Sequence, residues 1–218
     1  MYSSDIIERF RKIATASLAD ACDQVVGRTC FMSFEIKPRI NDAKVVGPAV
    51  TVQEGPANGV NAGPAHALDL IEDSTPGQVM VISLANSDKD VAVWGGIMTA
   101  GAWVKKMAGA ILDAGVRDVT EIRRDYDFPV YARSVSPGTT LGRYQTLASN
   151  VPVVCGGVEV CPGDLIVADI DGVVAIPAQH VEKVLAVAED IEVKEAAQAQ
   201  YIRETGSLKE GLAKYNRI

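Results

Sequence analysis

The sequence has 218 residues, of which 48% are hydrophobic, and it carries a formal net charge of -7 at pH 7. A chain of this length can bury one substantial core, and since no shift in composition divides it, we predict a single domain over residues 1–218. Acidic residues outnumber basic ones by 28 to 21. This excess argues against the basic surface that a nucleic-acid partner requires.

The hydropathy pattern and the cysteines indicate a cytoplasmic protein. No uncharged apolar run approaches the roughly 18 residues of a membrane span, and the first twelve residues lack the apolar stretch of a secretory signal. The four cysteines contain no C-x-x-C pair, so we expect free, mostly buried thiols. With only two histidines, a zinc site of several imidazoles is excluded, and any metal must be held by oxygen.

The first part of the chain has the patterns of short helices and apolar strands. Asp5 with Glu8, and Ser17 with Asp20, have the spacing of capping boxes at helix starts. Runs rich in Val and Ile and bounded by Gly or Pro are typical of strands. The patterns predict helices over 5–13, 17–22 and 64–72, and strands over 44–53 and 78–84.

Helices and strands continue to alternate in the second part. The patterns predict helices over 94–107 and 118–125, and strands over 108–112, 128–135, 151–160, 164–168 and 172–176. Asp113-Ala114-Gly115 is interpreted as a tight turn after its strand. The longest helix is predicted over 178–204, with Gly206 as its stop and a solvated polar face.

Several motifs are considered and set aside. A P-loop, a G-x-S-x-G elbow and a G-x-G-x-x-G turn after a strand are absent from the sequence. The glycine-rich stretch GPANGVNAGPAH, residues 55–66, lacks the lysine and glycine spacing of a phosphate site and is interpreted as a loop. Lys105 and Lys106 are interpreted as a solvated helix face, and His66 as a packed or capping group.

The informative stretch is WGGIMTAGAWVKKMAGAILDAGVRD, residues 94–118. It joins a helix that begins with glycines to a strand that ends in Arg117 and Asp118. Unpaired backbone N–H groups at the helix start, from Gly95 to Met98, can bind a carboxylate. Arg117 offers a charged fork to a keto or carboxylate oxygen, and Asp118 offers oxygen to a hard cation. Arginine and metal would then share one substrate.

A structural alternative stands beside this interpretation. Asp118-Val-Thr-Glu121 has the spacing of a capping box, and Arg117 could simply pair with a surface carboxylate. On local physics alone, these two interpretations remain open.

A family resemblance favours the functional interpretation. The segments SLADACD, VVGPAVTV, GAILDAGVRDVTEI and NVPVVCGGVEVCPGDLIVADIDGVVAIP resemble the RraA-like and 4-hydroxy-4-methyl-2-oxoglutarate aldolase family, over about residues 17–177. The resemblance implies a compact layered α/β/β/α domain of the swivelling β/β/α type, with N-terminal helices and a long C-terminal helix. It also implies a homotrimer or homohexamer, and a metal-dependent pyruvate aldolase that also decarboxylates oxaloacetate.

The resemblance also implies roles for particular residues. Arg117 would hold the keto oxygen of a small 2-oxo acid, and Asp118 would bind Mg²⁺ or Mn²⁺. The substrate carboxylate would lie on the helix start formed by Gly95, Gly96, Ile97 and Met98. The family acid that precedes this arginine, with twenty residues between them, is replaced here by Gly96. That departure puts the base for the substrate hydroxyl in doubt.

Two sources could replace the missing acid, and two other functions are possible interpretations. The replacement could be Asp90 or an acid of a neighbouring subunit, whereas Asp113 is interpreted as a turn residue. The alternative function is that of a non-catalytic RraA-type regulator that binds ribonuclease E, a branch expected to lack the acid after the arginine. A methyltransferase has no support, because no glycine-rich cofactor turn follows a first strand.

Overall fold

The computed structural model describes residues 2–58 and 65–216. In chain order the elements are α1 (Ser4–Lys12), α2 (Thr15–Val25), β1 (Lys37–Pro38), β2 (Val45–Pro56), α3 (Ala65–Asp73), β3 (Val79–Leu84), η1 (Ala85–Ser87), β4 (Ala92–Trp94), α4 (Gly96–Val104), β5 (Gly109–Val116), α5 (Val119–Asp125), β6 (Val130–Val135), β7 (Tyr144–Ser149), β8 (Val153–Cys155), β9 (Val158–Val160), β10 (Leu165–Asp169), β11 (Gly172–Ile176), η2 (Ala178–His180), α6 (Val181–Thr205) and α7 (Leu208–Tyr215).

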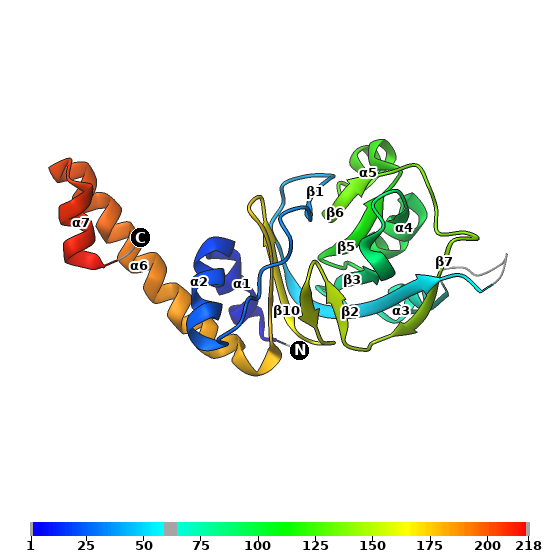
Figure 1. The fold of residues 1–218 in the computed structure, drawn as a ribbon, viewed down its shortest axis with the longest axis horizontal. Helices are drawn as coiled ribbons and strands as arrows, with labels where there is room; N and C mark the ends of the chain where they lie inside the picture. Colours follow the sequence, from blue (N-terminus) through cyan, green and yellow to red (C-terminus); the bar gives the residue numbers. More distant parts are fainter. Residues whose placement is uncertain (1, 59–64, 217–218) are drawn as a thin grey trace.

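A mixed sheet organises these elements (Figure 1). Its strand order is β1-β6-β5-β3-β2-β10-β11, with β4 beside β5 and β7 beside β2. The pairs among β2, β3, β5 and β6 are parallel, as expected where helices connect the strands. The long strand β2 pairs with β10 near its start and with β7 near its end. The carboxyl ends of these parallel strands therefore lie along one edge of the sheet, where ligand sites of α/β folds commonly lie.

Three apolar clusters hold four layers together. In the first, helices α3 and α4 pack on the parallel strands, where Val52, Ile82 and Leu112 are buried. In the second, strands β8 to β11 pack on the other face of those strands. In the third, helices α1, α2 and α6 cover the outer face of β10 and β11, around Leu165 and Val174. The predicted α/β/β/α layering is thus confirmed.

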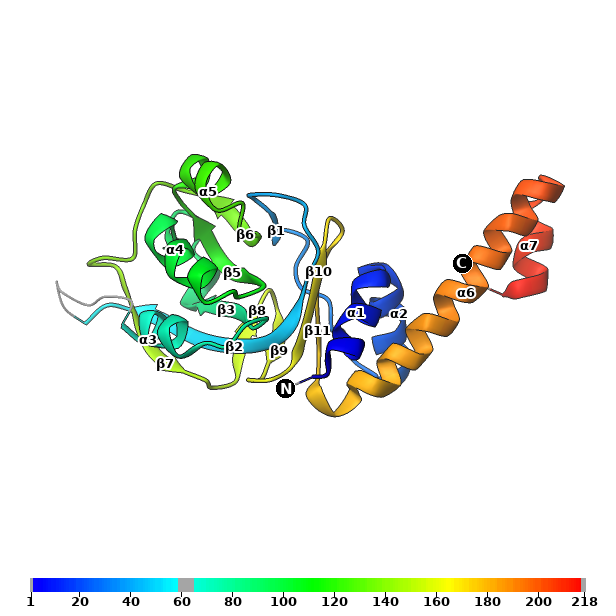
Figure 2. The ribbon, with the colours of Figure 1, turned by 180° about the vertical axis from the view of Figure 1, so that it is seen from behind.

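The last two helices form an arm (Figure 2). The first half of α6 packs against α2 and the sheet, and its second half carries the chain away from the body, where α7 folds back along it. Gly206 adopts a left-handed conformation at the end of α6, with φ 72°, so the predicted stop is confirmed. The rings of Tyr201 and Tyr215 meet edge to face and join the two helices.

Several sequence predictions need correction. Asp113-Ala114-Gly115 is no turn: β5 continues through it to Val116, with an irregularity in its pairing with β6. Residues 151–160 form the hairpin β8–β9 rather than one strand, because Gly156 and Gly157 both have positive φ. Strands β1, β4 and β7 and helix α7 were not predicted.

The two amino-terminal capping boxes are also wrong. Ser3 caps α1 by accepting from the Ile6 N–H, and the hydroxyl of Ser17, inside α2, donates to Glu192.

The remaining sequence predictions have mixed outcomes. Residues 59–64 of the predicted glycine-rich loop lie outside the described residues, and these include Pro64, the first residue of a predicted helix. The four cysteines are free and three of them are buried, as predicted. In the described part of the chain, no helix has the length and apolar character needed to cross a bilayer.

Candidate active site

Arg117, Asp118 and the start of α4 meet in one cleft of about 260 Å³. They meet because β4 runs parallel to β5, with Trp94 opposite Val116. The residues that follow these two strands therefore emerge side by side, and the Arg117 N–H donates to the Trp94 carbonyl at 3.0 Å. The cleft is lined by Leu68, Ala92, Val93, Trp94, Gly95, Gly96, Ile97, Met98, Arg117, Asp118, Thr139, Thr140 and Leu141. All six site residues predicted from the sequence lie among them.

Asp118 does not cap its own helix. Its backbone is left-handed, with φ 59°, and its side chain makes no capping hydrogen bond to α5. Instead, its Oδ2 atom accepts from the Gly96 N–H, 2.9 Å away, at the start of α4. The capping box proposed for Asp118 and Glu121 is therefore wrong. A carboxylate at the positive end of a helix is electrostatically favourable, which fixes Asp118 in the cleft.

The two glycines at the start of α4 have different constraints. A Cβ atom on Gly95 would lie 2.7 Å from Asp118 Oδ2 and 3.1 Å from Arg117 Cγ, so any other residue here would displace the Asp118 carboxylate. A Cβ atom on Gly96 would lie 3.6 Å from Asp118 Oδ2, which is ordinary contact. An acid at Gly96 would thus stand beside Asp118. Because this chain has glycine there, Asp118 is the one carboxylate lining the cleft within the described residues.

The amides at the start of α4 are only partly available. The Gly96 N–H is taken by Asp118, and the Thr99 N–H closes the first turn onto the Gly95 carbonyl at 3.0 Å. The N–H groups of Ile97 and Met98 have no acceptor among the described residues. Two of the predicted backbone donors, the N–H groups of Ile97 and Met98, are therefore available to bind an anion beside the Arg117 guanidinium.

Arg117 and Asp118 form a loose pair that leaves both groups accessible. The Arg117 Nε atom lies 3.7 Å from Asp118 Oδ2, and the two side chains are 42% and 41% exposed. Asp118 Oδ1 accepts no hydrogen bond from any described residue. The positive fork and one free carboxylate oxygen therefore face the same space, where a bound anion and a cation could be neighbours.

The donor set fits a magnesium-type cation better than a transition metal. Within residues 2–58 and 65–216, no group of three or more His, Cys, Asp or Glu side chains could hold a metal. Asp118 Oδ1 could hold one through a single bond, with water and substrate oxygens completing the shell. Mg²⁺ keeps several waters and is commonly bound by one or two carboxylates, so Asp118 suits it.

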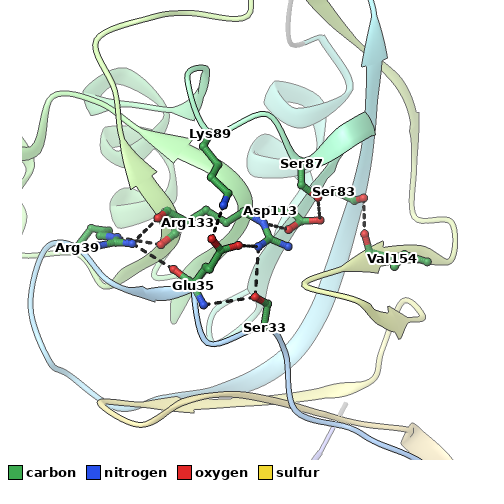
Figure 3. Close-up of polar contacts among 10 residues, drawn as sticks. Ser33, Glu35, Arg39, Ser83, Ser87, Lys89, Asp113, Arg133 and Val154 are labelled. Carbon is green, nitrogen blue, oxygen red and sulfur yellow. Dashed lines mark hydrogen bonds and ion pairs between the residues drawn. The ribbon is translucent and has the colours of Figure 1, made fainter.

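The other acids proposed as replacements lie elsewhere. Asp90 does not line the cleft, and its carbonyl accepts from the Ser136 hydroxyl. Asp113 is buried and pairs with Arg133 at 2.5 Å, within a polar network that also contains Glu35 and Lys89 (Figure 3). Asp113 is therefore a structural anion, and its interpretation as a turn residue is wrong.

Sequence reasoning missed part of the cleft wall. Leu68 of α3 and the segment 139–141 approach from distant parts of the chain. The Ser136-Pro137-Gly138 turn predicts a change of direction, but nothing in it predicts that the next residues return to the cleft. An isolated pairing of Ala92 with Thr139 brings them there.

Comparison with known proteins identifies the family of this chain. The family model of RraA-like proteins, described as Aldolase/RraA, matches residues 15–175. The chain belongs to the RraA-like family. This RraA-like chain is 37% identical over 184 residues to a Halalkalibacterium halodurans protein named "Putative 4-hydroxy-4-methyl-2-oxoglutarate aldolase", a match that covers 83% of this chain and 80% of that protein.

Solved structures share the fold. An uncharacterized protein from Pseudomonas syringae pv. tomato has a TM-score of 0.88 and 28% identity, over 98% of this RraA-like chain and 95% of that one. Streptomyces coelicolor RraAS2, described as an unusual member of the RNase ES inhibitor RraA protein family, has a TM-score of 0.84. That match covers 93% of this chain and 100% of the other at 24% identity, and it bears on the fold alone. The predicted family and fold class are confirmed.

Proposed function

We propose that this chain is a divalent-cation-dependent lyase of the cytoplasm that converts small 2-oxo acids through a pyruvate enolate. One observation carries the proposal: Arg117, Asp118 and the free amides of Ile97 and Met98 converge on one cleft. The aldolase name of the Halalkalibacterium halodurans relative supports the same class of reaction. Oxaloacetate and 4-hydroxy-2-oxo diacids are the proposed substrates.

The roles follow from the charges in the cleft. The amides of Ile97 and Met98 bind the substrate carboxylate, and the Arg117 guanidinium donates to the keto oxygen, where negative charge develops as the enolate forms. Asp118 would hold the cation, Mg²⁺ or Mn²⁺, which would supply Lewis-acid polarisation of the keto group. Trp94, Leu68 and Leu141 contribute apolar surface to the wall of the cleft.

Loss of carbon dioxide and retro-aldol cleavage form the same enolate, but they require different catalytic groups. Retro-aldol cleavage requires a base for the substrate hydroxyl, whereas decarboxylation does not. The cleft lacks a second acid at Gly96, and Asp118 already contacts the Gly96 N–H. Decarboxylation of oxaloacetate is therefore the reaction that we expect from the groups of this cleft together with a bound cation.

Pyruvate release tests the proposal. We expect pyruvate from oxaloacetate with Mg²⁺, and loss of the activity with a chelator. Arg117→Ala should lower turnover by about 10²- to 10³-fold, as for loss of a transition-state donor. Arg124→Ala is the matched control, because Arg124 is exposed, pairs with Asp125 and does not line the cleft. Near-native turnover of Arg117→Ala would remove the assignment.

A negative result has a defined alternative. If no 2-oxo acid releases pyruvate, and the chain is retained on immobilised ribonuclease E, the regulator becomes the better function. Light scattering tests the proposed assembly, since a homotrimer or homohexamer has three or six times the chain mass of 23.1 kDa.

A further inference from the structure

A second hollow adjoins the active-site cleft. It has a volume of about 410 Å³ and shares Arg117 and Asp118 with the cleft. Its remaining lining is Val119, Thr120, Glu121, Val135, Ser136 and Pro137. The two hollows therefore meet at Arg117 and Asp118. Within the described part of the chain, Asp118 and Glu121 are the acids that line either hollow.

Glu121 forms no hydrogen bond at the start of its helix. Its position, three residues after Asp118, is that of the reciprocal acid in a capping box, yet neither half of the box forms. Glu121 makes no hydrogen bond or ion pair with any described residue, although its charge interacts with that of Arg124 on the same helix. The left-handed turn at Asp118 thus frees both carboxylates from α5. One caps α4, and the other remains available to a ligand.

The missing acid at Gly96 leaves a chemical role open. One oxygen of Asp118 accepts from the Gly96 N–H, and the other is the cation donor of the proposed function. Neither oxygen is therefore well placed to take a proton. Building on the proposed function, we propose that Glu121 is the base that accepts the hydroxyl proton of a 4-hydroxy-2-oxo acid. The substrate beyond C3 then occupies the second hollow, beside Thr120 and Ser136.

The groups of this site account for every proton and electron pair of the cleavage reaction. The Glu121 carboxylate takes the proton of the C4 hydroxyl, the C4 oxygen becomes a carbonyl, and the C3–C4 bond breaks. The electron pair of that bond forms the enolate at C2 and C3, opposite Arg117. Protonation of C3, with the proton returned from Glu121, gives pyruvate, and the carbonyl product leaves through the second hollow. No oxidant or additional reactant is needed.

Two reactions of one protein test the role of Glu121. Decarboxylation of oxaloacetate needs no hydroxyl base, whereas cleavage of 4-hydroxy-4-methyl-2-oxoglutarate does. In Glu121→Gln we expect the rate of cleavage to fall about 10²-fold, which is the lower limit of a general-base contribution. The rate of decarboxylation should stay within about threefold of wild type, because that reaction needs no hydroxyl base. The ratio of the two rates in one sample does not depend on the folded fraction. Asp125→Asn, on the same helix but outside both hollows, is the control and should leave the ratio unchanged.

Each other outcome overturns a distinct statement. An equal fall in both rates would make Glu121 a structural residue, and an unchanged ratio with unchanged rates would remove it from the reaction. If wild type decarboxylates oxaloacetate but cleaves no 4-hydroxy-2-oxo acid, the base role is wrong while the lyase proposal stands. If wild type does neither, the proposed function fails, and the role of Glu121 fails with it.

Discussion

Gly95 shows how one absent side chain permits the active-site geometry. Its backbone is extended, with φ -157° and ψ -168°, so alanine could adopt the same conformation. The obstacle is contact, because a Cβ atom would lie 2.7 Å from the Asp118 carboxylate. Gly95→Ala should therefore displace Asp118 and lower pyruvate release by about 10²-fold, the usual cost of a misplaced catalytic group.

The neighbouring glycine supplies the matched control for that prediction. A Cβ atom on Gly96 meets Asp118 only at ordinary contact distance, and alanine is favoured inside a helix. Gly96→Ala should keep near-native turnover and a melting temperature at or above that of wild type. Equal losses in the two variants would show that the Gly95 contact does not control the site.

The buried pair of Arg133 and Asp113 ties several elements together. Asp113 is on β5 and Arg133 on β6, and the guanidinium also donates to Glu35 at 2.5 Å and to Ser33 at 3.3 Å (Figure 3). Ser87, in η1, donates to the second oxygen of Asp113 at 3.0 Å. The network therefore joins the adjacent strands β5 and β6 to the segment that leads into β4 and the cleft.

Removing one partner of this pair should lower the free energy of unfolding by more than the intact pair contributes to it, because the other charge stays buried. Arg133→Met leaves Asp113 buried without its cation, and we expect unfolding free energy to fall by about 3–5 kcal/mol. Adding Asp113→Leu should restore part of the loss, because no unpaired charge remains. Lys89→Met, which removes an exposed partner of Glu35, should cost at most about 1 kcal/mol. Urea unfolding measures all three, and additive losses in the double variant would contradict the coupling.

The elements that were predictable are those with dense apolar patterns. β2, β3, β10 and β11 carry Val and Ile between Gly or Pro residues, and their predicted bounds agree closely with the structure. β7, with the sequence YQTLAS, has no such pattern, because it is half-exposed and forms mainly through pairing with the end of β2. Likewise the turn interpretation of Asp113 failed because its partner, Arg133, is twenty residues away.

The candidate site was predictable in its members but only partly in its contacts. Arg117 and Asp118 end an apolar strand, and glycines open the next helix, so local sequence identifies both groups. Whether Asp118 caps α5 or α4 depends on the pairing of β4 with β5, which no local pattern contains. The freedom of Glu121 follows from that same choice, and for this reason the second hollow was not predicted.

At the scale of the whole molecule, one buried acid should make stability depend on pH. Glu54, on β2 between Leu84 and Thr146, is 1% exposed, and its Oε2 atom has no partner among the described residues. Burial raises the pKa of Glu54 to about 7 from its ordinary value of 4.5. As pH rises between these values, the unfolded chain loses this proton while the folded chain keeps it, so stability falls and then levels off above about pH 7.

The size of this effect can be measured by difference. Between about pH 5.5 and pH 8, Glu54 should remove roughly 2 kcal/mol from the stability of wild type, at 1.36 kcal/mol per pKa unit. Glu54→Gln removes the titration, and any constant cost of its amide cancels when the two pH values are compared. Urea unfolding at both pH values should therefore show the variant gaining on wild type as pH rises, with the exposed Glu182→Gln as the control. A difference between wild type and Glu54→Gln that is the same at both pH values would mean that this carboxyl does not titrate in the folded protein over that range, and that its burial is relieved by water or by movement of β2.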